Sequence, residues 1–434
     1  MRGTLKLHIP ISLITTCFAL FFFVFEDMGI RMIYLYAFMG LVLLLHIVSK
    51  PKMVRSRITM AFLFLSIVTI FWAMLPYALH SYDVMTLVIS ITLCALLALV
   101  SKPDENEVNK MLKVIVVIAF AISVYVIIVS FFPNLYINYI SKFIDEKPRV
   151  NTIRMLRMHY GVMIGGNVTL INHILVLSLL IIINKYFIYG YKKHTMATVR
   201  ASIVVLIGLC AMLLENRKGE LLVFILVFIY ALCFGGSIGV TERVRKTILY
   251  IMAGVFVMVI LFTIANKYGL TDRYLKFVKN LMSGDMQSAA TGRLTLWNTA
   301  INLFKENPVV GIGWGNTRQY ISMFNTANQT YIHNVHCVVL QLLCETGVIG
   351  CVMFMTPVAF IIRQMKKTVN YLRKRNCTSL LPKLLASVAL EYQWFLLLNG
   401  LIDSTWHRIS FWPFYAVSII MAVAAQRFAH ENDI

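Results

Sequence analysis

Charged residues are scarce in this chain. Of its 434 residues only 14% are charged and 59% are hydrophobic, whereas a soluble globular domain is roughly a quarter charged. This composition excludes an ordinary soluble protein. Repeated apolar stretches of about 17–25 residues, the length that spans a bilayer, indicate an integral membrane protein. No small-residue cleavage site follows the first stretch, so we expect no cleavable signal peptide.

Acidic residues are the scarcer charged class. The chain has 19 Asp and Glu against 40 Lys and Arg, a formal net charge of +21. In a soluble protein this excess would suggest a nucleic-acid partner. In a membrane protein it is explained by basic loops kept in the cytoplasm and by anionic membrane lipid, so we expect no nucleic acid.

The sequence also lacks a CxxC spacing, an internal repeat and a low-complexity segment. Its eight cysteines lie mostly within apolar runs, so we interpret them as small core residues rather than disulfides or metal ligands. We therefore expect residues 1–434 to form a single polytopic membrane domain.

Hydropathy predicts an all-α membrane protein with twelve transmembrane helices. The predicted ranges are 10–25, 29–48, 58–79, 84–101, 114–132, 168–184, 198–215, 220–238, 247–266, 335–362, 383–401 and 409–427. An even number of spans places both termini on one side.

The short loops indicate the orientation. Lys and Arg cluster at 50–57, 185–193, 243–246 and 363–375, so the positive-inside rule predicts that these loops and both termini are cytoplasmic. The long segments 133–167 and 267–334 are then external, and we expect 267–334 to contain short helices before the tenth span.

Basic residues also occur on the predicted external side. The stretch 147–214 contains no Asp or Glu, which favours an anionic ligand at this face. Arg217 and Lys218 lie where the seventh span ends and the eighth begins. A helix N-terminus beside an arginine suits phosphate, although an arginine that snorkels to the interface is the alternative.

A second candidate region is "AATGRLTLWNTAINLFKENPVVGIGWGN", residues 289–316. Thr291 can cap a helix, and Arg293 lies in its first turn, where the helix dipole disfavours a cation unless an anion is bound. Pro308 ends this helix and the glycines that follow predict a pliable turn. "GIGWGN" follows no strand of a βαβ unit, so it is not a dinucleotide site.

A third region is "TYIHNVHCVVLQLLCETGVIG", residues 330–350. His333 and His336 lie one turn apart at the start of the tenth span. A metal pair is disfavoured because the nearest acid, Glu345, is about two and a half turns past His336. Two interpretations remain: a histidine that caps a membrane helix at headgroup level, or an imidazole that takes a proton from a hydroxyl.

Two further positions, Arg408 and Glu391, lie outside these three regions. Arg408 lies in the last external turn, "NGLIDSTWHRISFWPF", and is a further site candidate. Trp406 and Trp412 in the same turn suggest an aromatic belt. Glu391, inside the eleventh span, is costly in lipid, so we expect it to bond to a neighbouring helix.

Taken together, three segments resemble the O-antigen ligase and polymerase family of bacterial membrane glycosyltransferases. They are "LLENRKGELL", "TGRLTLWNTAINLFKENPVVGIGWGN" and "HCVVLQLLCETGVIG", within residues 210–350. The resemblance implies glycan transfer from undecaprenyl pyrophosphate to a sugar hydroxyl at the external face of the bacterial inner membrane. It also implies inversion at the anomeric carbon, no metal and no cofactor. The acceptor would be a glycan or lipid A-core, in polysaccharide or lipopolysaccharide biosynthesis, with other polysaccharide-assembly proteins as expected partners.

The resemblance also implies roles for individual residues. Arg217 and Arg293 match arginines that hold the pyrophosphate, with Lys218 assisting, and His336 matches the histidine that assists the attacking hydroxyl. The family histidine is usually followed by Asn, Ser or Gln, but here by Cys337. This departure favours a repeat-unit polymerase over a ligase. His333 is the alternative match, but its register puts Cys344 where a later glycine belongs.

A secondary transporter or flippase for a lipid-linked or anionic substrate is the alternative from another class. Transport sites lie near the bilayer midplane between pseudo-repeats. The sequence shows no such halves, and its notable polar residues lie at the predicted external edge.

Overall fold

The computed structural model describes residues 10–27, 32–48, 53, 55–76, 78, 82–157, 168–190, 195–234, 240–285, 293–317, 319–320, 334–375 and 379–431. These residues form helices and connecting loops, and no strand occurs among them. The prediction of an all-helical protein is therefore confirmed for the described chain.

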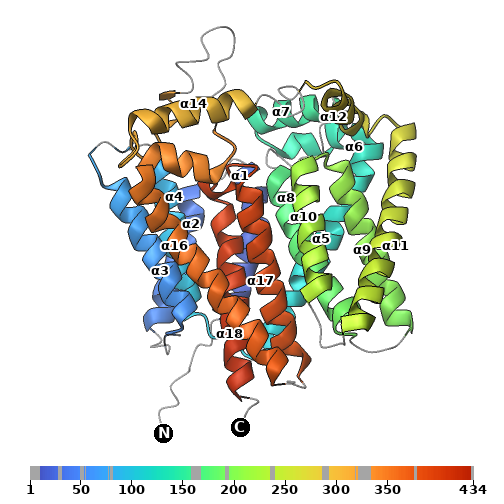
Figure 1. The fold of residues 1–434 in the computed structure, drawn as a ribbon, viewed down its shortest axis with the longest axis horizontal. Helices are drawn as coiled ribbons and strands as arrows, with labels where there is room; N and C mark the ends of the chain where they lie inside the picture. Colours follow the sequence, from blue (N-terminus) through green and yellow to red (C-terminus); the bar gives the residue numbers. More distant parts are fainter. Residues whose placement is uncertain are drawn as a thin grey trace.

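Most of the chain forms one bundle of helices (Figure 1). Its helices are α1 (Ile11–Asp27), α2 (Met32–Val48), α3 (Arg57–Ala73), α4 (Tyr82–Val100), α5 (Glu105–Phe131), α8 (Val168–Ile182), α9 (Thr195–Leu214), α10 (Lys218–Phe234), α11 (Val240–Lys267), α16 (Val338–Lys374), α17 (Leu380–Gly400) and α18 (Phe411–Glu431). A π-helix, η2 (Ile183–Ile188), continues α8. Each predicted span falls on one of these helices, although α5, α11 and α16 extend well beyond theirs.

Six described helices are long and apolar enough to cross a membrane: α5, α8 with η2, α9, α16, α17 and α18. The count becomes seven if α11 and α12 (Asp272–Met282), which meet at a bend of 106°, form one broken span. Four shorter apolar helices lie within α1 to α4. A multi-pass membrane protein is therefore supported, and the count of twelve stays a prediction.

Local sequence explains where the helices begin. The Asp104 side chain accepts a hydrogen bond of 2.7 Å from the Glu107 backbone N–H and so caps α5. Ser56 and Thr59 form a reciprocal capping box at the start of α3. Such caps satisfy backbone N–H groups that have no partner within the helix.

The core is built around α18, which contacts α1, α4 and α17. Tyr415, Ile419 and Phe428 are each no more than 2% exposed. At its start the Trp412 ring lies 6.2 Å from the Trp406 ring of the preceding loop. Both tryptophans are at least 94% buried, so they anchor the loop 401–410 to the bundle and do not form the predicted lipid-facing belt.

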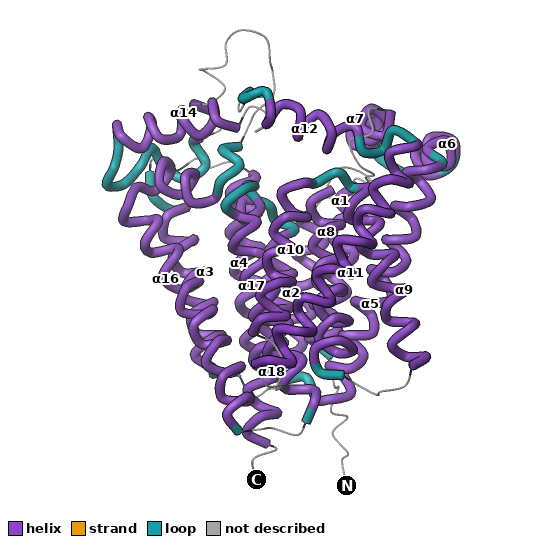
Figure 2. Tube along the Cα trace, turned by 45° about the vertical axis from the view of Figure 1, so that its right-hand side comes forward, coloured by secondary structure: helices purple, strands orange, loops and turns teal. Residues whose placement is uncertain are grey.

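Short helices cover one end of the bundle, the upper end in Figures 1 and 2. They are α6 (Pro133–Asn138), η1 (Ile140–Phe143), α7 (Glu146–Arg157), α12 and α14 (Arg293–Glu306). All come from the two long segments that the sequence predicts to be external. The last described helix, α18, ends at the opposite, lower end of the bundle (Figure 1). Which end faces the cytoplasm stays a prediction.

The glycine-rich segment 307–316 docks onto a break in α16. The Ile312 backbone N–H donates to the Cys344 carbonyl at 2.9 Å, and the Gly313 N–H donates to the Glu345 carbonyl at 2.9 Å. These bonds satisfy carbonyl groups that the break removes from the helix ladder. The expected pliable turn is therefore bonded in place against α16.

Two glycines make this close approach possible. Gly347, in the break, has φ 63° and ψ −168°, and a Cβ there would lie 2.2 Å from the Val309 carbonyl oxygen. Gly311, with φ 71°, would place a Cβ 2.4 Å from the Glu345 carbonyl carbon. Only glycine combines a positive φ with this contact distance. The second and third sequence motifs thus interlock backbone to backbone.

Candidate functional site

His336 forms the centre of the candidate site, just before α16 begins. Its Nδ1 lies 2.9 Å from Asp403 Oδ1, and its backbone N–H donates to Ser404 Oγ at 2.8 Å. These bonds hold it at φ 55°, a conformation that residues other than glycine rarely adopt. A carboxylate at Nδ1 favours the tautomer with its proton there, which leaves Nε2 able to accept a proton.

Asp403 joins His336 to Arg408. Its Oδ2 lies 3.6 Å from Arg408 Nη2, and its Oδ1 also accepts the Ser404 backbone N–H at 2.8 Å. Burial tends to raise the pKa of the Asp403 carboxyl. The His336 hydrogen bond and the charges of Arg408 and Arg217 outweigh burial, so the pKa lies below its usual range. Asp403 is therefore a carboxylate at neutral pH.

Arg217 lies in the tight connection between α9 and α10. Asn216, with φ 57°, reverses the chain there, and its Nδ2 donates to the Leu270 carbonyl at 2.9 Å. Arg217 is half-buried, and its Nε is buried without a hydrogen-bond partner among the described residues. Its charge acts on the Asp403 carboxyl. This half-buried guanidinium could receive an anion.

Lys218 is the first residue of α10, where the helix dipole is positive. Its Nζ lies 4.3 Å from the centroid of the Phe277 ring on α12. This cation–π contact holds the ammonium between α10 and α12. Lys218 therefore adds positive charge beside Arg217 at the same helix N-terminus.

Arg293 is the first residue of α14, and its Nη1 donates to the Ile402 carbonyl. Ile402 directly precedes Asp403. Burial lowers the pKa of the Arg293 guanidinium, with the Asp403 carboxylate opposing this and Arg217 adding to it. The hydrogen bond to Ile402 places the Arg293 guanidinium beside the loop that carries Asp403.

The structure thus joins four separate parts of the chain at the upper end of the bundle. They are the α9–α10 connection, the start of α14, the start of α16 and the loop 401–410. Arg217, Lys218, Arg293, His336 and Arg408 take part, whereas His333 lies outside the described residues. In the part of the chain that the structure describes, no three His, Cys, Asp or Glu side chains form a group suited to a metal.

The sequence did not predict the contact between Asp403 and His336. Asp403 lies in the last predicted external turn but in no recognisable motif, and it is 67 residues from His336. An acid next to several cations, in a chain poor in acids, is the signal that could have pointed to it.

A second buried contact supports the loop that carries Asp403. Glu345 on α16 is fully buried; its Oε2 lies 3.4 Å from His407 Nε2, and its Oε1 accepts from Gln341 Nε2 at 3.1 Å. His407 lies in the short helix η3 (Thr405–His407), between Asp403 and Arg408. Glu345 therefore connects α16 to the loop 401–410 through His407.

An apolar groove of about 650 Å³ runs between α9, α10 and α11. Leu213 and Leu221 line it on either side of the Arg217–Lys218 connection. Tyr274 of α12 also lines it, and its hydroxyl donates to the Leu213 carbonyl at 3.2 Å. The groove therefore adjoins the cationic cluster.

Comparison with known proteins adds one match. The family model described as O-antigen ligase matches residues 201–355, a little over one third of the chain. The match includes Arg217, Lys218, Arg293 and His336, and it ends before the loop 401–410. No curated protein matches the chain at a significant level. The resemblance predicted from the motifs is confirmed over this range, and it supports a glycosyltransferase of the O-antigen ligase or polymerase type.

Proposed function

Because residues 201–355 match the O-antigen ligase family, we propose that this protein transfers a glycan from undecaprenyl pyrophosphate to a sugar hydroxyl. The reaction takes place at the external face of the bacterial inner membrane and serves the assembly of O-antigen, capsule or exopolysaccharide. The observation that carries the proposal is the His336–Asp403 pair, which shares one cluster with Arg217 and Arg293.

The cationic residues bind the donor in this proposal. Arg217 and Arg293, assisted by Lys218, neutralise the diphosphate, since guanidinium groups form paired hydrogen bonds to phosphate oxygens. The polyprenyl tail occupies the apolar groove beside Leu213 and Leu221. These side chains supply the positive charge, so the proposed reaction uses neither a metal nor a cofactor.

His336 activates the acceptor in this proposal. Its Nε2 takes the proton of the attacking hydroxyl, and Asp403 stabilises the resulting imidazolium. The hydroxyl oxygen bonds to the anomeric carbon as the bond from that carbon to the diphosphate oxygen breaks. The diphosphate leaves with the electron pair, and attack from the opposite face inverts the configuration.

Within this class we favour a repeat-unit polymerase over a lipid A-core ligase. Cys337 occupies the N-cap position of α16 and is 8% exposed, but its side chain makes no capping hydrogen bond. It therefore does not supply the polar group found after the family histidine. Deletion of the gene tests this choice: loss of a polymerase leaves one repeat unit on the acceptor, whereas loss of a ligase leaves none.

The test of the proposed activity is transfer by the purified chain in proteoliposomes. Given an undecaprenyl-pyrophosphate-linked glycan and an acceptor glycan, the protein should form the extended product and release undecaprenyl pyrophosphate. Movement of the lipid-linked glycan across the bilayer without any product would contradict the proposal and support the transporter or flippase alternative.

A further inference from the structure

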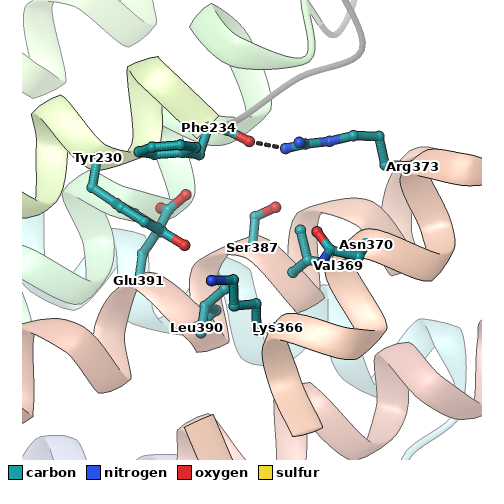
Figure 3. Close-up of a pocket in the computed structure, with 9 residues that line it drawn as sticks. All are labelled: Tyr230, Phe234, Lys366, Val369, Asn370, Arg373, Ser387, Leu390 and Glu391. Carbon is teal, nitrogen blue, oxygen red and sulfur yellow. Dashed lines mark hydrogen bonds between the residues drawn. The ribbon is translucent and has the colours of Figure 1, made fainter. Parts of the chain in front are cut away.

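A second polar cavity lies toward the end of the bundle opposite the candidate site. Side chains from α10, α16 and α17 converge on it (Figure 3). They are Tyr230, Phe234, Lys366, Val369, Asn370, Arg373, Ser387, Leu390 and Glu391. Its volume is about 50 Å³, which is enough for a small polar group.

The polar lining comes from regular helix faces. Lys366, Asn370 and Arg373 follow one another at spacings of four and three residues on α16. Ser387 and Glu391 are four residues apart on α17. Residues at these spacings share one side of a helix. The cavity is therefore built into rigid elements of the bundle.

The buried side of the cavity carries Glu391, and residues of the segment 183–189 form hydrogen bonds to its lining. Glu391 is 2% exposed, and its Oε2 accepts a hydrogen bond of 2.5 Å from Asn184 Nδ2, which confirms its expected bond to a neighbouring helix. Ser387 Oγ lies 2.6 Å from the Tyr189 hydroxyl. Asn184 belongs to η2, a π-helix, and such helices occur frequently at functional sites.

The mouth of the cavity is basic. Lys366 is exposed, and no carboxylate lies within ion-pair distance of it among the described residues. Arg373 donates to the Phe234 carbonyl at the end of α10 (Figure 3). A simple anion that entered the cavity would meet the Glu391 carboxyl, and a simple cation would have to pass Lys366 and Arg373. A molecule that carries both an amine and a phosphate can place the amine at Glu391 and the phosphate at Lys366 and Arg373.

An exposed apolar stripe leads from this cavity along α10. Leu222 is 58% exposed, Leu226 is 49% exposed, and Tyr230 follows at the same four-residue spacing. An acyl chain can lie along this stripe while its headgroup enters the cavity. The stripe therefore favours a membrane lipid over a soluble solute.

We infer that this cavity binds the headgroup of an aminophospholipid of the phosphatidylethanolamine type. The lipid ammonium donates to Glu391 and lies against the Tyr230 ring, and the phosphate lies between Lys366 and Arg373. A primary ammonium donates hydrogen bonds that a choline headgroup cannot donate, and a glycerol headgroup carries no positive charge for Glu391. None of the residues that line this cavity belongs to the candidate site around His336.

Native mass spectrometry of the full-length protein in detergent tests this inference. The protein is titrated with phosphatidylethanolamine, phosphatidylcholine and phosphatidylglycerol that carry identical acyl chains. We expect phosphatidylethanolamine to bind about tenfold more tightly than either other lipid, the effect of one charge-assisted contact. Glu391→Gln should abolish this preference. Lys366→Gln should weaken binding about tenfold, whereas the control Lys367→Gln, an exposed neighbour that does not line the cavity, should not.

Several results would overturn the inference. Equal binding of the three lipids by the native protein would do so, as would an equal loss of binding in Lys366→Gln and Lys367→Gln. If phosphatidylglycerol bound more tightly than phosphatidylethanolamine, Glu391 would not contact a lipid ammonium. Displacement of the lipid by an equal concentration of soluble glycerophosphoethanolamine would assign the cavity to a free solute. If Glu391→Gln does not fold, the lipid comparison on the native protein and Lys366→Gln still decide.

Discussion

At the scale of single residues, the Asp403 carboxylate connects the candidate base to the candidate anion site. It accepts a hydrogen bond from His336 and lies beside Arg408, and the charge of Arg217 also reaches it. Its low pKa keeps it charged, so it can orient the imidazole and stabilise the protonated form. In the proposed reaction it is therefore a positioning residue, which acts through His336.

Replacement of Asp403 by Asn should slow transfer about a hundredfold, at the lower end of what a general base contributes. The amide keeps the size of the side chain but removes the charge that stabilises the imidazolium. The measurement is the kcat for glycan transfer in proteoliposomes. The matched control is Asp145→Asn, an exposed carboxylate directly before α7. A normal kcat for Asp403→Asn would rule out this role.

Arg293→Ala should raise the barrier to transfer by about 2–4 kcal/mol, the usual effect of losing one electrostatic donor to a developing charge. Arg293→Lys tests whether the charge alone is sufficient. Lysine keeps the positive charge but not the paired donors of the guanidinium group, so we expect a transfer rate between those of the native protein and Arg293→Ala. Rates are measured with saturating acceptor, and Lys279→Ala on α12, an exposed cation, is the control. If Arg293→Ala transfers as fast as that control, Arg293 does not contact the diphosphate.

At the scale of elements, the interlock between segment 307–316 and α16 positions two motifs. The backbone bonds at Ile312 and Gly313 hold the segment against α16. Glu345, whose carbonyl accepts the Gly313 N–H, also contacts His407 in the loop that carries Asp403. The interlock is therefore connected to the loop that carries Asp403 through the contacts of Glu345.

Gly347→Ala should destabilise the protein by at least about 1–3 kcal/mol, because it forces a positive φ on alanine and drives its Cβ into the Val309 carbonyl. Gly284→Ala is the matched control. Gly284 also has a positive φ, 75°, but its Cβ would meet no atom within 4 Å. Thermal unfolding midpoints compare the two variants. Equal losses would show that the close approach at Gly347 adds nothing beyond backbone strain.

At the scale of the whole molecule, the groove and the cationic cluster lie next to each other. The groove runs between α9, α10 and α11, and the α9–α10 connection carries Arg217 and Lys218. An apolar chain in the groove would therefore lie next to a charged headgroup bound at the cationic cluster. This arrangement matches a donor that joins a polyprenyl tail to a diphosphate.

Val257→Trp fills the groove and should raise the KM for the polyprenyl-linked donor about tenfold, the effect of losing the burial of roughly two methylene groups. The kcat and the KM for a short-chain donor analogue should not change. Met252→Trp is the control, because Met252 lies on the same helix but is 65% exposed and does not line the groove. A rise in KM for both donors alike would place the tail elsewhere.

The sequence by itself determined the membrane class, the positions of the bundle helices and the motif residues Arg217, Arg293 and His336. Hydrophobic runs and short motifs are local in the chain, so they can be recognised without a fold. Only the tertiary structure paired His336 with Asp403, docked segment 307–316 onto α16 and placed Glu391 at the floor of a polar cavity. These contacts join residues far apart in the sequence, and helix packing alone decides which distant polar groups share a buried space.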